Sequence, residues 1–212
     1  RVTDATEKRW VLRRPPLGHV PATAHDMRRE HRILAALGPT DVPVPPVVGL
    51  SADDSVNGAP FYVMDFVEGH IVRNRAAAEA LDLKARTRAG EDLVDVLARI
   101  HAVEPAAVGL DDLGRHEGYI ERQLKRWYGQ WEKSKTRELS AIDEVHDALL
   151  AAVPEQQGVS IVHGDYRLDN CMLADDGTVA AVLDWEICTL GDPLADMGLL
   201  LVYWADRDDP FS

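Results

Sequence analysis

The stretch VHGDYRLDN (residues 162–170) places a histidine, two aspartates and an asparagine within nine positions, directly after a short apolar run. Carboxylates next to apolar residues are costly to bury unless they have a partner. An aspartate followed five positions later by an asparagine is a common pattern, and a lone copy is typical of a capped polar turn. The stretch therefore needs a partner elsewhere in the chain before it can be assigned any chemistry.

A second acidic motif supplies that partner. Short strands are predicted at 171–173 and 179–183, joined by the turn ADDGT, and the motif LDWE with Asp184 follows them. Oxygen ligands on adjacent loops, here from Asn170 and Asp184, suit Mg²⁺, which prefers hard oxygen ligands and keeps water or phosphate in its remaining positions. Asp165 is then placed to accept a proton from a hydroxyl held in line with a phosphate, as phosphoryl transfer requires.

Length and composition restrict the class of protein. The 212 residues suffice for one large domain or two small lobes, and the net charge of −13 argues against general nucleic-acid binding. The longest uncharged apolar run is far shorter than the ~20 residues of a membrane span, and the first twenty residues show no signal-peptide pattern. Cys171 and Cys188 make no disulfide framework. We therefore expect a cytoplasmic protein with packed free thiols that binds neither nucleic acid nor membrane.

The order of predicted elements divides the chain at Gly69. We expect a strand at 10–12, a helix at 24–37, an extended segment at 43–50, a strand within 59–69, helices at 76–102, 117–134 and 139–152, and a helix capped by Asp192. Residues 1–69 form the predicted N-terminal lobe, and 70–212 the mostly helical C-terminal lobe. Trp127 and Trp131 lie at helical spacing and predict a core face, with a place in an acceptor pocket as the alternative. His101 and His146 are expected to face solvent or cap a helix.

The motifs HGDYRLDN, VLDWE and GDPLADMG together resemble the aminoglycoside phosphotransferase and choline kinase family, whose members are relatives of protein kinases. The resemblance implies an α+β, bilobal protein-kinase-like fold with a small mostly-β N-terminal lobe and a larger helical C-terminal lobe. We expect both lobes to be incomplete in this sequence. The resemblance also implies that Asp165 is the catalytic base and that Asn170 and Asp184 hold Mg²⁺ on ATP.

Three further residues take roles from the same resemblance. His163 belongs to the catalytic loop, where we expect it to support the loop rather than transfer a proton, because the kinase mechanism leaves that step to the aspartate. Arg167 lies two positions after the predicted base, where protein kinases often carry a lysine near the transferred phosphate. Asp196 is expected to tie the following helix to the back of the catalytic loop.

The resemblance extends upstream of the catalytic loop. WVLRRPP resembles the kinase strand that carries a phosphate-binding lysine, but Arg13 stands in its place, and Glu30 matches the glutamate that pairs with it. A guanidinium binds both carboxylate and phosphate well. FYVMDFVEG resembles the hinge that binds adenine through the backbone, here around Asp65, Phe66 and Val67. The fifteen glycines form no G-x-G motif, so the phosphate loop of this family is expected to lie before the first residue.

More narrowly, VLRRPP, FYVMDFVEG, ERQLKRW and VHGDYRLDN resemble the kinase-like domain fused to, or encoded with, some acyl-CoA dehydrogenases. This implies a functional link to an acyl-CoA dehydrogenase, and phosphorylation of hydroxyacyl-CoA is one known activity of that group. The predicted function is transfer of the γ-phosphoryl group of ATP, or of GTP, to a hydroxyl-bearing small molecule. A CoA thioester needs a basic patch, for which Arg122, Lys125 and Arg126 are candidates, whereas cationic aminoglycosides or choline suit acidic pockets.

Two rival functions stay open from the sequence. One is a pseudokinase that binds nucleotide or a partner without turnover, which the replacement of lysine by Arg13 favours. The other is a metal-dependent phosphoesterase, which also uses clustered aspartate and histidine but usually needs ligands for two metal ions. The acceptor and the oligomeric state are open as well.

Overall fold

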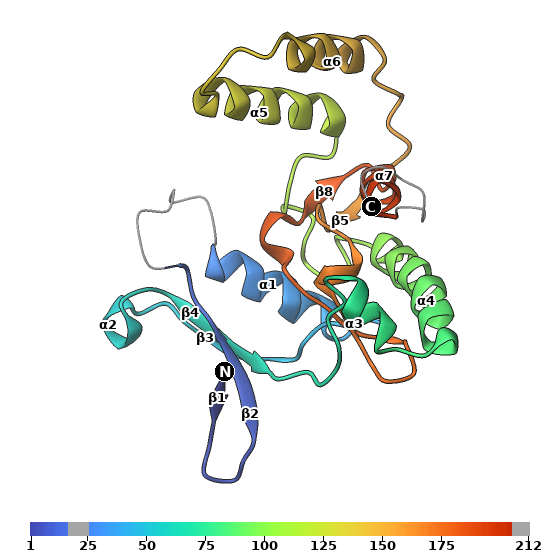
Figure 1. Ribbon diagram of the computed structural model, residues 1–212. Helices are drawn as coiled ribbons and strands as arrows, with labels where there is room; N and C mark the ends of the chain where they lie inside the picture. Colours follow the sequence, from blue (N-terminus) through green and yellow to red (C-terminus); the bar gives the residue numbers. More distant parts are fainter. Residues whose placement is uncertain (17–25, 205–212) are drawn as a thin grey trace.

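The computed structural model describes residues 1–16 and 26–204 (Figure 1). The first two residues of the predicted helix 24–37 lie outside the described residues. The N-terminal part contains β1 (Val2–Thr3), β2 (Arg9–Arg13), α1 (Met27–Leu37), β3 (Val47–Ser51), α2 (Asp54–Asn57) and β4 (Phe61–Asp65). The rest contains α3 (Arg75–Glu79), α4 (Leu83–Ala102), α5 (Tyr119–Ser134), α6 (Ser140–Ala151), β5 (Ser160–Val162), β6 (Cys171–Leu173), β7 (Val179–Val182), β8 (Thr189–Gly191) and α7 (Leu194–Tyr203), with two short 3₁₀ helices, η1 (Leu168–Asn170) and η2 (Trp185–Ile187).

The N-terminal part is an antiparallel sheet with one long helix beside it. The strand order is β1-β2-β4-β3, and the register sets Arg13 of β2 opposite Tyr62 of β4. Helix α1 packs against β3 and β4 and is capped by Asp26, whose side chain accepts from two backbone N–H groups of its first turn. It buries Ile33 and Leu37 completely. The predicted strands and helix of this region are confirmed.

The C-terminal part surrounds two short β pairs, β5-β8 and β6-β7, with helices. Helix α4 packs on β5 and β7, and its predicted apolar face is confirmed, since Leu93, Val96, Leu97 and Ile100 are at most 1% exposed. The predicted free thiols are also confirmed, because both cysteines are buried and unpaired. No helix in the described part of the chain is both long enough and apolar enough to cross a bilayer.

The single helix predicted at 76–102 is wrong, because the chain forms α3 and α4 there. The break at residues 80–82 has a local cause: the Asp82 carboxylate accepts from the backbone N–H of Ala85 at 2.7 Å and starts a new helix. Leu81 is buried in the break. Apolar residues recur at helical spacing on both sides of the break, so the spacing alone gave no sign of the N-cap at Asp82.

Helices α5 and α6 form a pair set apart from the rest of the C-terminal part (Figure 1). The core expectation for Trp127 is wrong, since this residue is 51% exposed, while Trp131 is half-buried. Spacing identified an amphipathic face but not the element that would cover it, and α6 covers only one side. His146 was also predicted wrongly: its ring stacks on Tyr128 with 4.0 Å between centroids.

The connector after β4 joins the two parts at Gly69. Its φ of 151° and its surroundings both require glycine, because a Cβ there would lie 2.4 Å from the carbonyl oxygen of Leu173. His70 and Leu173 exchange two backbone hydrogen bonds, of 2.7 and 2.8 Å. The connector is thereby fixed against β6. The lobe boundary at Gly69 stays a prediction.

Candidate active site

His163 anchors the loop that follows β5. The ring is completely buried, its Nε2–H donates to the carbonyl of Leu183 at 2.9 Å, and its Nδ1 accepts from the backbone N–H of Asp165 at 3.2 Å. Burial lowers the pKa of His163, although the Asp196 charge opposes that shift. A neutral ring with both nitrogens engaged shapes the loop, in line with the predicted supporting role.

Asp196 holds the same loop from behind. The fully buried carboxylate accepts from the backbone N–H groups of His163 and Gly164, both at 2.8 Å. This confirms the predicted tie between α7 and the loop. His101 was expected to face solvent or cap a helix, and that expectation is wrong, because its Nε2 lies 3.0 Å from Asp196 Oδ2 and its side chain is only 16% exposed.

Asp165 and Asn170 are joined directly. The Asn170 amide nitrogen donates to both the carbonyl oxygen and the carboxylate Oδ2 of Asp165, at 2.8 Å each. Both amide hydrogens are therefore used on one side, and Oδ1 is left as an oxygen ligand. Arg167 lies beside them, with Nε 3.1 Å from Asp165 Oδ1 and Nη1 3.1 Å from Asp169 Oδ2. The loop thus fixes one carboxylate between an amide and a guanidinium.

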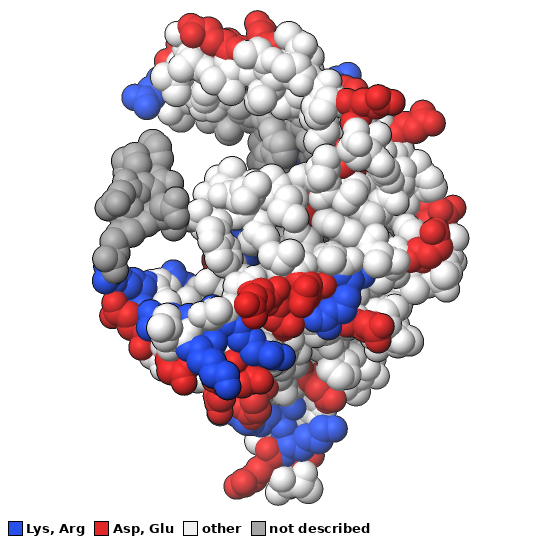
Figure 2. Space-filling view, turned by 90° about the vertical axis from the view of Figure 1, so that its right-hand side faces the viewer, with Lys and Arg blue, Asp and Glu red and all other residues white. Residues whose placement is uncertain are grey.

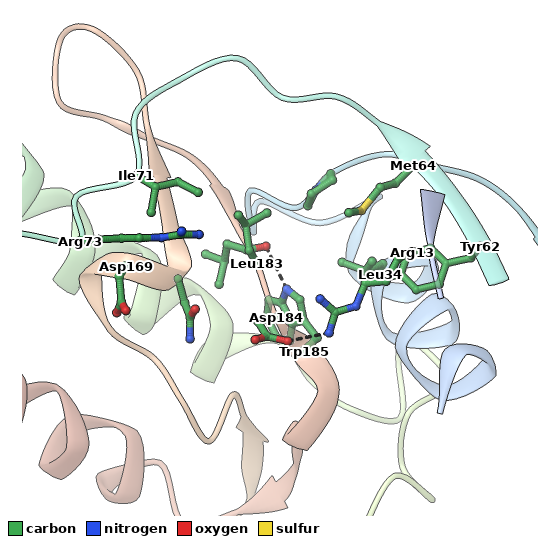
Figure 3. A pocket seen from close by; sticks show the side chains of 13 residues that line it. Arg13, Leu34, Tyr62, Met64, Ile71, Arg73, Asp169, Leu183, Asp184 and Trp185 are labelled. Atoms are coloured by element: carbon green, nitrogen blue, oxygen red, sulfur yellow. Dashed lines mark hydrogen bonds and ion pairs between the residues drawn. The ribbon is translucent and has the colours of Figure 1, made fainter. Parts of the chain in front are cut away.

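Asp184 projects from the turn after β7. Its φ of 64° and ψ of 60° lie in the left-handed region, which aspartate tolerates better than most residues. The next residue, Trp185, is buried, and its indole N–H donates to the carbonyl of Val182 at 3.0 Å. Asp184 Oδ1 accepts from Arg13 Nη2 at 2.7 Å (Figure 3).

Arg13 is the centre of an ion-pair cluster between the sheet and the C-terminal part. Its Nε lies 2.6 Å from Glu30 Oε2, and its Nη2 lies 3.5 Å from Glu186 Oε2. Tyr62 also donates to Glu30, at 3.0 Å. Burial acts to lower the pKa of Arg13, but the charges of Glu30 and Asp184 outweigh burial and raise it. The predicted Arg13–Glu30 pair is present, and the guanidinium remains a cation.

A cleft with a volume of about 190 Å³ lies beside this cluster. Of the predicted site residues, Arg13, Asn170 and Asp184 line it. The predicted site residues outside its lining are Glu30, His163, Asp165, Arg167 and the hinge residues Asp65, Phe66 and Val67. The backbone N–H groups of Asp65 and Phe66 are already bonded to the carbonyls of Pro46 and Arg9. The cleft is instead lined by Met64 and Ile71, on either side of the predicted hinge.

Two arginines of the site carry no sequence motif. Arg73 reaches into the cavity from the side opposite Arg13 (Figure 3). Arg29 of α1 donates to the carbonyl of Glu186 at 3.4 Å and also to the carbonyl of Cys188. The two Arg29 contacts join residues that are distant in sequence, so only the fold reveals them.

The residues of the cleft fit a magnesium ion. The Asp184 carboxylate and the Asn170 amide oxygen are hard oxygen ligands that line the same space. Residues 1–16 and 26–204 contain no group of three or more histidine, cysteine or acidic side chains that could hold a metal alone. Phosphate oxygens and water would therefore complete the octahedral shell, as they usually do for Mg²⁺.

Comparison with known proteins identifies the family. The model of the phosphotransferase enzyme family (APH) matches residues 1–211. The chain belongs to this phosphotransferase family. Acyl-CoA dehydrogenase family member 10 of Mus musculus is 38% identical over 206 residues, a match that covers 96% of this chain but only 19% of that protein. The phosphotransferase chain thus spans about a fifth of this relative.

Solved structures show the same fold for this phosphotransferase chain. A Ralstonia eutropha protein assigned to the aminoglycoside phosphotransferases is 38% identical, with a TM-score of 0.77 over 87% of this chain and 57% of that one. The ternary complex of APH(2″)-IIa with streptomycin and ATP is 20% identical, with a TM-score of 0.62 over 88% of this chain and 62% of that one. The expected α+β, protein-kinase-like fold is confirmed.

Proposed function

We propose that this chain carries the catalytic part of a kinase that moves the γ-phosphoryl group of ATP to a hydroxyl of a small molecule. One observation carries the proposal: Arg13, held by buried Glu30, contacts Asp184, and both line a single cleft together with Asn170. Asp165 is fixed at the edge of the same loop by the Asn170 amide. A cation for phosphates, two oxygen ligands and a positioned carboxylate are the parts that phosphoryl transfer needs.

Each residue has a distinct task in this proposal. Asn170 Oδ1 and the Asp184 carboxylate would hold Mg²⁺, which when bound offsets charge on the nucleotide phosphates. Arg13 offsets phosphate charge from the sheet side. Asp165 orients the acceptor hydroxyl and accepts its proton, while Arg167 stands 3.1 Å from that carboxylate and can meet the transferred group.

The ion pair between Arg13 and Asp184 also favours a second candidate, a nucleotide-binding or interaction module without turnover. The guanidinium contacts the predicted principal metal ligand at 2.7 Å, so Mg·ATP has to exchange this contact for phosphate and metal contacts. A module without turnover could bind nucleotide even if Arg13 stays partly bound to Asp184. The two candidates bind the same nucleotide and differ in whether product forms.

We propose a hydroxyacyl-CoA as the acceptor and a functional link to an acyl-CoA dehydrogenase. The relative from Mus musculus supports this choice, because it is named as an acyl-CoA dehydrogenase family member and is 38% identical to this chain. The aminoglycoside kinase at 20% identity supports the fold alone.

Replacement of Asp165 by Asn tests the base. ADP release is measured with Mg·ATP and a panel of hydroxyacyl-CoA, aminoglycoside and choline acceptors, and nucleotide affinity is measured by calorimetry. We expect turnover with a hydroxyacyl-CoA, a fall in kcat of about 10²–10⁴-fold in Asp165→Asn, and an unchanged Kd for Mg·ATP. Asp147→Asn, at a side chain that is 82% exposed, is the control. An undiminished rate in Asp165→Asn would refute the base, and nucleotide binding without turnover on any acceptor would favour the non-catalytic module.

A further inference from the structure

A second groove adjoins the cleft on the side of the catalytic loop. Its volume is about 440 Å³, and Arg73 and Asp169 line both spaces. The groove runs between the connector that leads into α3, the catalytic loop and the end of α7. Its polar and aromatic lining comprises Arg73, Arg75, Arg167, Asp169, Tyr203 and Trp204.

Arg73 is the cation in the groove that has no partner of its own. It forms no hydrogen bond or ion pair with any residue in the described part of the chain. Figure 3 shows its side chain at the neighbouring cleft, and it also lines the groove. Among the residues that the structure describes, Arg75 pairs only with Glu79, one turn along α3, and both side chains are mostly exposed. Such a pair contributes little and is easily released. Two guanidiniums are therefore available to an anion.

The remaining charges in the groove are balanced. Arg167 Nη1 lies 3.1 Å from Asp169 Oδ2, so the one carboxylate of the lining is neutralised. The Arg167 guanidinium also stacks over the Tyr203 ring, 4.9 Å from its centroid. Trp204 lies against Gly90 of α4, where a Cβ would approach its ring to 3.2 Å, and is otherwise half exposed. The lining of the groove thus combines two aromatic side chains with two arginines that an anion can recruit.

We propose that this groove is the acceptor subsite, and that Arg73, aided by Arg75, binds a phosphate group on the acceptor. The inference rests on the proposed function: Arg167 lines this groove and its Nε lies 3.1 Å from Asp165 Oδ1, so the groove is the space next to the proposed base in which an acceptor would lie. A guanidinium fork matches phosphate oxygens in geometry and charge. The acceptor class is a phosphorylated molecule with a free hydroxyl, such as a CoA thioester.

This placement differs from the basic patch expected on 122–126. Arg122 lines a separate, shallow pocket with residues 115–118 and donates to the carbonyl of Arg115. Arg126 stacks on Trp127 of its own helix. The groove at Arg73, in contrast, adjoins the cleft that contains Asn170 and Asp184.

Calorimetry with CoA and with pantetheine, which lacks both the phosphates and the adenosine of CoA, tests the subsite without turnover. We expect Arg73→Gln to weaken CoA binding about 10- to 100-fold and Arg75→Gln to weaken it less. Pantetheine affinity should stay unchanged in both variants. Because Arg73 also lines the nucleotide cleft, its replacement should change the Kd for Mg·ATP less than the Kd for CoA. In Arg75→Gln the Kd for Mg·ATP should stay unchanged, since Arg75 lines the groove but not the cleft. Arg86→Gln, at an exposed arginine of α4, is the matched control, and the double change Lys125→Gln with Arg126→Gln tests the patch on α5.

Three results would overturn the subsite. They are an equal loss of Mg·ATP affinity in Arg73→Gln, a loss of CoA affinity confined to the α5 variant, and no CoA binding by the unaltered protein. A failure of the proposed function has a different signature. In that case CoA binding depends on Arg73, but no acceptor supports ADP release.

Discussion

Asp196 is the residue whose removal should most damage the catalytic loop without touching a substrate. Its buried carboxylate accepts from the N–H groups of His163 and Gly164 at 2.8 Å. Hydrogen bonds to a charged group contribute about 1.5–3 kcal/mol each. Loss of these two hydrogen bonds in Asp196→Ala, together with the 3.0 Å contact to His101, should lower the free energy of unfolding by at least about 3–6 kcal/mol. Asp196→Asn keeps one acceptor and relieves the desolvation of a buried charge, so its loss should be about 1.5–3 kcal/mol.

Urea titration of both variants measures these losses, and steady-state kinetics measure their effect on the loop. Asp147→Asn, at an 82% exposed side chain, should stay within about 0.5 kcal/mol of the unaltered protein. In Asp196→Asn, kcat should fall while the Kd for Mg·ATP holds, because Asn170 and Asp184 do not contact Asp196. A free energy of unfolding within about 0.5 kcal/mol of the unaltered protein in Asp196→Ala would refute the reasoning.

Two more residues give sharp expectations. Arg13→Lys should keep turnover, because a lysine still offers a cation to Glu30 and to phosphate. Arg13→Met removes the cation and should lower kcat/KM by about 10²–10³-fold, measured by ADP release. A normal rate in the methionine variant would contradict the assignment of Arg13. Burial lowers the pKa of His163, so below about pH 6.5 the unfolded chain binds a proton that the native protein does not. Stability measured by urea titration should therefore fall as the pH drops from 7.5 to 5.5, and fall less in His163→Gln; equal slopes would contradict the role of this ring.

Local signals explain what the sequence could predict. The apolar spacing of residues 27–37 predicted α1, and the Asp165-to-Asn170 spacing together with Asp184 predicted the loop. The break at Asp82 was missed because the apolar residues keep their period across an N-cap. The prediction that Trp127 is buried is wrong because amphipathic spacing identifies the apolar face of a helix but does not say whether another element covers that face. The sequence did not predict a role for Arg73, because that role depends on the side chain lining both the cleft and the groove, which only the fold brings together.

Two arginines join the N-terminal part to the C-terminal part, one through carboxylates and the other through backbone carbonyls. This difference affects how a nucleotide could enter the cleft. Arg13 contacts the carboxylates of Glu30 and Asp184, of which the second is the proposed metal ligand. Arg29, one residue before Glu30, instead donates to backbone carbonyls of the segment after Asp184. These carbonyl contacts do not involve the Asp184 carboxylate, so a metal ion at Asp184 does not compete for them. Arg13 can therefore exchange Asp184 for phosphate while Arg29 keeps α1 against the C-terminal part, so the exchange requires no separation of the two parts.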